Sequence, residues 1–104
     1  MTEAGTEPVR DWLRTLPAVD RKLIGENIKT VQFGWPLGMP LVDHLGGGVW
    51  EVRSKLDKRI ARTLFANEGD MMILLHAFIK KRQKTPKPDL DLAKDRLKQL
   101  RRRK

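Results

Sequence analysis

A chain of 104 residues is long enough for one hydrophobic core, so we expect a single functional domain over residues 1–104. It holds 22 lysines and arginines against 13 aspartates and glutamates, and the resulting net charge of +9 favours a polyanionic partner such as nucleic acid. The lack of cysteine excludes disulfides, thiolate zinc sites and a cysteine nucleophile. No apolar run approaches the ~18 residues that span a bilayer and no signal peptide opens the chain, which predicts a cytoplasmic protein without membrane contact.

The positive charge is concentrated in the second half of the chain. Residues 1–50 hold five basic and six acidic side chains, whereas residues 51–104 hold seventeen and seven. The last four residues, 101–104, form a basic tail. We therefore expect the anion-binding surface in the second half.

Two helices are predicted at the start of the chain, because apolar residues recur at helical spacing in residues 7–16 and again in 18–33. Residues 1–6 are expected to be disordered. The next stretch, 34–48, collects glycine and proline and predicts a loop. Its triplet Gly46-Gly47-Gly48 lacks the Lys-Ser/Thr that follows a phosphate-binding loop, so we interpret it as a flexible segment.

Three strands are predicted next, at 49–55, 59–67 and 70–80, joined by short turns as an antiparallel meander. The third is nearly all apolar, which predicts a central strand covered on both faces. Leucines at helical spacing after Pro86 predict a final helix that ends in the basic tail. Two helices, three strands and one helix together predict an α+β fold.

The cations inside the predicted strands are the most informative residues for chemistry. Arg62 shares its strand face with Ile60 and Leu64, so its guanidinium either reaches an edge or points into a cleft. Its own strand offers no carboxylate near its centre. His76 and Lys80 share one face of the third strand by two-residue periodicity. Such cations suit stabilisation of phosphorane charge during RNA cleavage.

Less specific interpretations stay open beside this one. His76 also fits a core histidine held by a backbone group. The cations from Lys80 to Lys84 fit a solvated basic loop, and the tail fits a nonspecific or disordered segment. The two histidines, His44 and His76, follow no metal-binding pattern, so we expect no metal site and no cofactor.

Several blocks of the sequence form a specific pattern when taken together. They are Glu7 to Leu13, Gln32 to Pro40, Leu45-Gly46, Val49-Trp50-Glu51-Val52-Arg53, Arg62-Thr63-Leu64-Phe65, Leu74 to Lys81, Thr85-Pro86-Lys87 and the region of Ala93. The pattern resembles the phage-derived HigB-type family of the RelE/ParE toxin superfamily over about residues 5–100. The resemblance implies a RelE-like fold, ribosome-dependent cleavage of translated mRNA that inhibits translation and growth, and a partner antitoxin with a helix-turn-helix domain.

The resemblance also implies which residues act. By match to its blocks, Arg53 and Arg62 face the scissile phosphate and Lys80 and Lys81 close the site, while His76 has a less defined role there. Further candidate RNA contacts are Arg59, Arg82, Lys84, Arg101, Arg102 and Arg103.

Toxins of this family usually have a strand before the first helix, and here only residues 1–6 precede Glu7. Either the strand is lost or translation begins upstream. A lost strand would leave one sheet edge open for pairing with another chain, such as the antitoxin or a second copy.

Two other functions remain as alternatives. A ParE-like inhibitor of DNA gyrase would act by binding a protein and would need no RNA-cleaving cations. A non-catalytic nucleic-acid-binding module would explain the net charge but not the arginines within strand patterns.

Overall fold

The computed structural model describes residues 8–34, 42–57, 59–68, 71–80 and 86–102. In chain order they form α1 (Pro8–Arg14), α2 (Ala18–Gly34), β1 (Val42–Gly46), β2 (Val49–Leu56), β3 (Arg59–Glu68), β4 (Met71–Lys80) and α3 (Lys87–Arg102). This arrangement confirms the predicted α+β class and is compatible with a RelE-like fold. The predicted disorder of residues 1–6, and any strand there, lie outside the described residues.

The described sheet has four strands, so the predicted number of three was wrong. Val42–Gly46 falls in the expected loop, yet it pairs with β2 through His44 and Trp50. The glycine triplet that follows is a tight hairpin turn with φ values of 92°, 64° and 81°. Glycine adopts these positive angles at little cost, so the composition that suggested a flexible loop belongs to a turn.

The four strands run in the order β1-β2-β3-β4, and each neighbouring pair is antiparallel. β4 therefore lies at an edge of the described sheet, and its predicted central position was wrong. Its apolar sequence has another cause, because α1 packs near one face of the strand and α3 near the other. The part of the prediction that concerned cover on both faces is confirmed.

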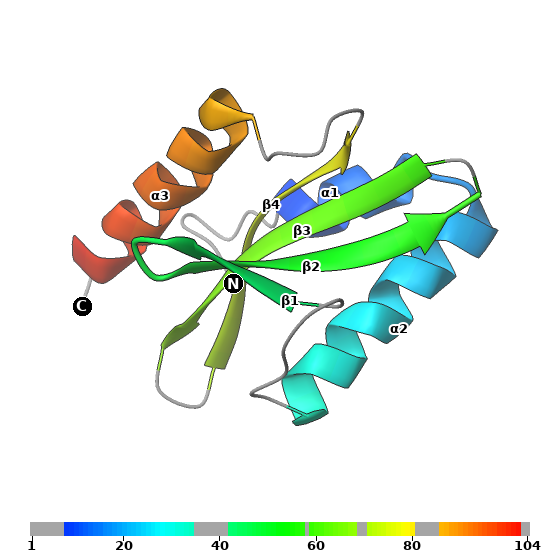
Figure 1. Cartoon of the computed structure of the whole chain (residues 1–104), viewed down its shortest axis with the longest axis horizontal. Helices are drawn as coiled ribbons and strands as arrows, with labels where there is room; N and C mark the ends of the chain where they lie inside the picture. The colour runs from blue at the N-terminus through cyan, green and yellow to red at the C-terminus, as the bar shows by residue number, and fades with distance from the viewer. Residues whose placement is uncertain (1–7, 35–41, 58, 69–70, 81–85, 103–104) are drawn as a thin grey trace.

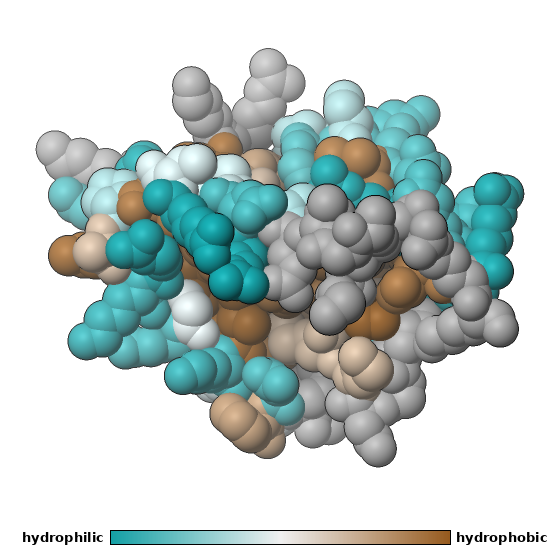
Figure 2. Space-filling view, turned by 180° about the vertical axis from the view of Figure 1, so that it is seen from behind, coloured by the Kyte–Doolittle hydropathy of each residue, from teal (hydrophilic) through white to brown (hydrophobic). Residues whose placement is uncertain are grey.

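The sheet lies between α3 on one face and α1 and α2 on the other (Figure 1), and an apolar layer fills the space on each face. On one face, Ala93 and Leu97 of α3 pack with Leu64 and other sheet residues. On the opposite face, α1 and α2 cover the sheet, with Ile24 packed near Ala61. In the view from behind, apolar side chains appear as separate areas between hydrophilic ones (Figure 2).

A register shift in β4 decides which residues meet α3. Leu64 pairs with His76, but the next residue of β3, Phe65, pairs with Leu74, so Leu75 is an extra residue in its strand. The Leu75 carbonyl accepts a hydrogen bond of 2.6 Å from Arg96 Nη1 of α3. Burial lowers the pKa of Arg96. Because of the bulge, the successive residues Leu75 and His76 both face α3. The hydrogen bond from Arg96 to the Leu75 carbonyl holds the helix against this part of the strand.

We expect Arg96→Met to lower the free energy of unfolding by about 1.5–3 kcal/mol, because it removes a charged donor from the Leu75 carbonyl. Lys98→Met, at an exposed position of the same helix, should change it by no more than about 0.5 kcal/mol. Urea unfolding followed by circular dichroism measures both. Equal stability of the two variants would show that the hydrogen bond from Arg96 does not stabilise the packing of α3 on the sheet.

Candidate active site

The face of the sheet that α3 covers in part carries three rows of residues across β2, β3 and β4. The strand register defines the rows as Glu51–Leu64–His76, Arg53–Arg62–Phe78 and Lys55–Ile60–Lys80. We call them the polar rows. Ile60 is 39% exposed, so the outer row reaches the surface.

Four of the predicted catalytic residues, Arg53, Arg62, His76 and Lys80, thus lie on one face of the sheet although they come from three strands. For Lys80 the register places the backbone position only.

Two arginines and two carboxylates alternate in a connected network at this face. Glu51 is fully buried, and its Oε1 accepts hydrogen bonds from Arg62 Nη1 and, at 3.2 Å, from Arg53 Nε. Arg53 Nη2 in turn donates to Asp43 Oδ2 of β1 at 3.0 Å. The order along the network is Arg62, Glu51, Arg53, Asp43, so the formal charges of its four side chains cancel.

Arg62 is a buried arginine whose partner comes from the neighbouring strand. Its side chain is 6% exposed and forms an ion pair with Glu51. Burial lowers the pKa of Arg62, and the adjacent Glu51 carboxylate opposes that shift. The sequence argument looked for a carboxylate on the arginine's own strand and so missed Glu51. A signal was present, because Glu51 is an acidic residue two positions after Val49, on the inward face of its strand.

Arg53 is the arginine of the network that reaches solvent. Its side chain is 28% exposed, and its two ion pairs use Nε and Nη2. Among the described residues, this leaves Nη1 of the guanidinium for another acceptor. Because two carboxylates fix the group in place, Arg53 presents a preorganised donor.

His76 is held by a carboxylate and not by a backbone group. Its Nε2 lies 2.7 Å from Asp89 Oδ1, and its ring stacks on Phe78 with ring centroids 5.5 Å apart. The bond occupies Nε2, and Nδ1 has no hydrogen-bond partner among the described residues. Asp89 was missed in the sequence, where an acidic residue in the first turn of a helix already has an explanation in the helix dipole.

The remaining candidates within the described residues do not join this cluster. Arg59 lies on the α2 side of the sheet, where its Nη2 donates to Asp20 Oδ2 at 2.6 Å. Arg101 and Arg102 end α3, at the other end of the helix from Asp89. Four further candidates lie outside the described residues: Lys81, Arg82, Lys84 and Arg103.

The described part of the chain contains no group of three or more metal-ligating side chains. Within the same residues, no helix has the length and apolar character needed to cross a membrane.

Comparison with known proteins gives one family. The family described as "Phage derived protein Gp49-like" matches residues 11–98, which include every residue of the polar rows. No curated protein matches the chain.

We expect Arg62→Ala to lower the free energy of unfolding by about 3–5 kcal/mol, because it removes one of the two described arginines that pair with the buried Glu51 carboxylate. Arg53→Ala should lower the free energy of unfolding by a smaller amount, since the Glu51 carboxylate would still pair with Arg62. Urea denaturation of both variants measures the difference. An Arg62→Ala variant as stable as the parent would show that the buried Glu51 carboxylate does not depend on Arg62.

Proposed function

Because the chain belongs to the Gp49-like family of phage-derived proteins, which is related to the RelE and HigB toxins, we propose that it is the toxin of a type II toxin–antitoxin system. In this proposal it is an mRNA endoribonuclease of the HigB type that works on the translating ribosome, in the cytoplasm, and stops growth. A helix-turn-helix antitoxin silences it. The observation that carries the chemistry is the gathering of Arg53, Arg62 and His76 in adjacent polar rows.

The proposed reaction is transfer within the RNA strand. The ribose 2′-oxygen attacks the adjacent phosphorus, its proton passes to a base, and the bond from phosphorus to the 5′-oxygen breaks as an acid protonates that oxygen. The products are a 2′,3′-cyclic phosphate and a free 5′-hydroxyl. Excess negative charge on the phosphoryl oxygens is the part of the transition state that fixed cations stabilise.

Arg53 is the residue we assign to the phosphate. Its partial exposure and its fixed guanidinium support direct contact through Nη1. The burial of Arg62 supports a positioning role, in which Arg62 holds Glu51 and Glu51 holds Arg53. Lys80, whose backbone lies in the outer polar row, and Lys81 beside it in the sequence are the cations proposed to close the site.

His76 is the residue we assign to proton transfer. An imidazole can both accept and donate a proton near neutral pH. Asp89 acts as a positioning residue, since a carboxylate that accepts from Nε2–H keeps the proton there and leaves Nδ1 as the reactive nitrogen. The stacked Phe78 ring limits rotation of the imidazole.

Replacing Arg53 with Ala should lower mRNA cleavage by ~100-fold or more, as loss of a preorganised charge donor does. Arg53→Lys should rescue only part, because an ammonium lacks the fork that matches phosphate oxygens. Arg59→Ala is the matched control, since it breaks an arginine–aspartate pair on the opposite face of the sheet. Primer extension on mRNA from expressing cells gives the cut sites, and a melting curve checks the fold.

The same experiment separates the proposal from its alternatives. Cuts within translated frames that disappear with Arg53→Ala support it. A DNA damage response without cuts would identify a gyrase inhibitor, and neither effect would identify a non-catalytic binding module. A folded Arg53→Ala protein that remains fully toxic would contradict the assignment of Arg53.

For the pair of His76 and Asp89, we expect His76→Ala to lower the cleavage rate by about 100-fold and Asp89→Asn to lower it by about 10-fold. The effect of both changes should be on kcat and not on KM. Nitrogen-15 NMR of the imidazole should show one tautomer, with the proton on Nε2, in the parent and a mixture in Asp89→Asn. Asp91→Asn, at an exposed position one half-turn further along α3, serves as control. If Asp89→Asn changes only the melting temperature, the pair is structural.

A further inference from the structure

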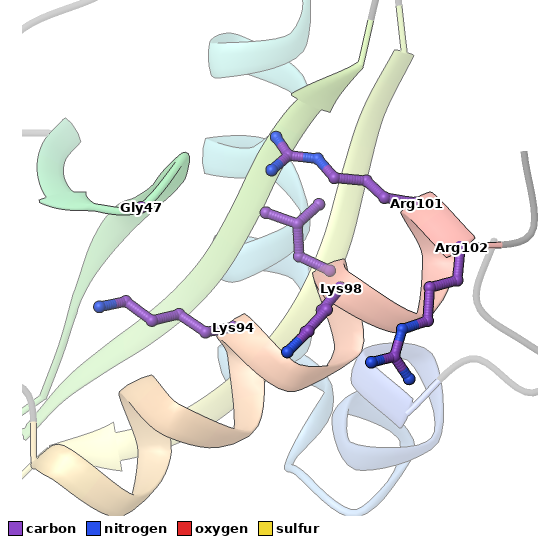
Figure 3. Close-up of a pocket in the computed structure, with 6 residues that line it drawn as sticks. Gly47, Lys94, Lys98, Arg101 and Arg102 are labelled. Atoms are coloured by element: carbon purple, nitrogen blue, oxygen red, sulfur yellow. The ribbon is translucent and has the colours of Figure 1, made fainter.

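A groove of about 440 Å³ lies between the C-terminal half of α3 and the β1–β2 turn, away from the Asp89 end of the helix (Figure 3). It is lined by Gly47, Lys94, Leu97, Lys98, Arg101 and Arg102. Four of these six residues are cations and none is acidic. We call this the basic groove.

The glycines of the hairpin turn allow two of the cations to approach it. A Cβ atom on Gly47 would lie 3.1 Å from Lys94 Cε, and one on Gly48 would lie 3.2 Å from Arg101 Nη2. Both glycines also have positive φ, which disfavours other residues. Figure 3 shows Lys94 and Arg101 reaching toward the hairpin, while Lys98 and Arg102 point away from it. The turn that looked like a flexible loop in the sequence forms one wall of the groove.

The helix alone does not account for these cations. Lys94, Lys98 and Arg102 follow one another at four-residue intervals, and like charges at this spacing destabilise a helix. Arg101 and Arg102 also lie in the last turn, where cations are favourable, but that benefit fades beyond one turn. Asp91 and Asp95 stand three positions before Lys94 and Lys98, where they offset part of this repulsion, but they do not line the groove. We call Lys94, Lys98 and Arg102 the ladder. Bound negative charge would offset the repulsion that remains among its three cations.

The chemistry of the walls favours a repeating polyanion over an acidic protein segment. Among the described lining residues Leu97 alone has a purely apolar side chain, and it is 2% exposed, so little of it is available to the apolar anchor that protein partners usually use. Successive cations of the ladder are about 6 Å apart along the helix axis, which suits a chain of charges better than a single carboxylate. Phosphate contacts of this kind position a nucleic acid without reading its sequence.

We propose that the basic groove binds the phosphate backbone of RNA as a second contact, separate from the polar rows. The inference rests on the proposed function, because that function makes RNA the polyanion. The candidate active site and the basic groove then lie toward opposite ends of α3. One strand, or two parts of one folded RNA, would contact both.

The test compares two triple variants with equal loss of charge. The groove variant carries Lys94→Gln, Lys98→Gln and Arg102→Gln, and the control carries Arg21→Gln, Lys22→Gln and Lys29→Gln at exposed positions of α2. Binding of a fluorescent single-stranded 2′-O-methyl RNA, which lacks the attacking hydroxyl, is measured by anisotropy over a salt series. The groove variant should reduce the slope of log K against log salt by about 2, because roughly 0.7 is lost for each phosphate contact removed. The control should keep most of the slope.

The outcomes are separable. Equal losses in both triple variants would show an effect of net charge alone and would overturn the groove. Unchanged RNA binding in the groove variant, with loss of binding to polyglutamate, would overturn it in favour of an acidic protein partner. Loss of RNA binding in the groove variant, at an unchanged or higher melting temperature, supports it. That result would stand even if Arg53→Ala left cleavage intact, so failure of the proposed cleavage and failure of the groove are distinguishable.

Discussion

The carboxylate of Glu51 lies fully buried inside the sheet, and a charge in that position is stable only with close partners. Arg62 and Arg53 supply them from β3 and from β2 itself. Because alternate residues of a strand face opposite ways, a slip of one residue between β2 and β3 would turn Arg62 away from Glu51. The ion pair and the apolar layers therefore select the same register. That register also aligns the polar rows, so the candidate active site depends on the same interaction as the fold.

The bulge at Leu75 adds the second half of the site. In an unbroken strand, Leu75 and His76 would face opposite sides of the sheet. With the extra residue, Leu75 packs under α3 while His76 meets Asp89 at the start of the same helix. Arg96 satisfies the Leu75 carbonyl at this point. The position of α3 and the orientation of His76 are thus coupled, and a change at the bulge would alter both.

Much of this arrangement follows from local sequence and the rest does not. The helices and the three longer strands begin and end within one or two residues of the predicted bounds, because periodicity and proline or glycine boundaries are local signals. β1 was not predicted because it is short and ends at a glycine. β4 was predicted to be central because its sequence is apolar on both faces, although it is an edge strand that two helices cover. The partners Glu51 and Asp89 could not be assigned from the sequence, because each pairing joins different elements and depends on register.

The net charge of +9 is not concentrated at the candidate active site, because the charges of the network there are balanced. In the network of Arg62, Glu51, Arg53 and Asp43 the charges cancel, and each carboxylate fixes a guanidinium. In the basic groove four of the six described lining residues are cations and none of the six is acidic. Unbalanced charge attracts a polyanion from a distance and makes its binding depend on salt. A fixed, balanced arginine attracts less strongly but defines where a phosphate oxygen can sit. In the proposed function, α3 therefore connects two surfaces with different tasks. The basic groove increases affinity for RNA, and the polar rows fix the position of the scissile phosphate.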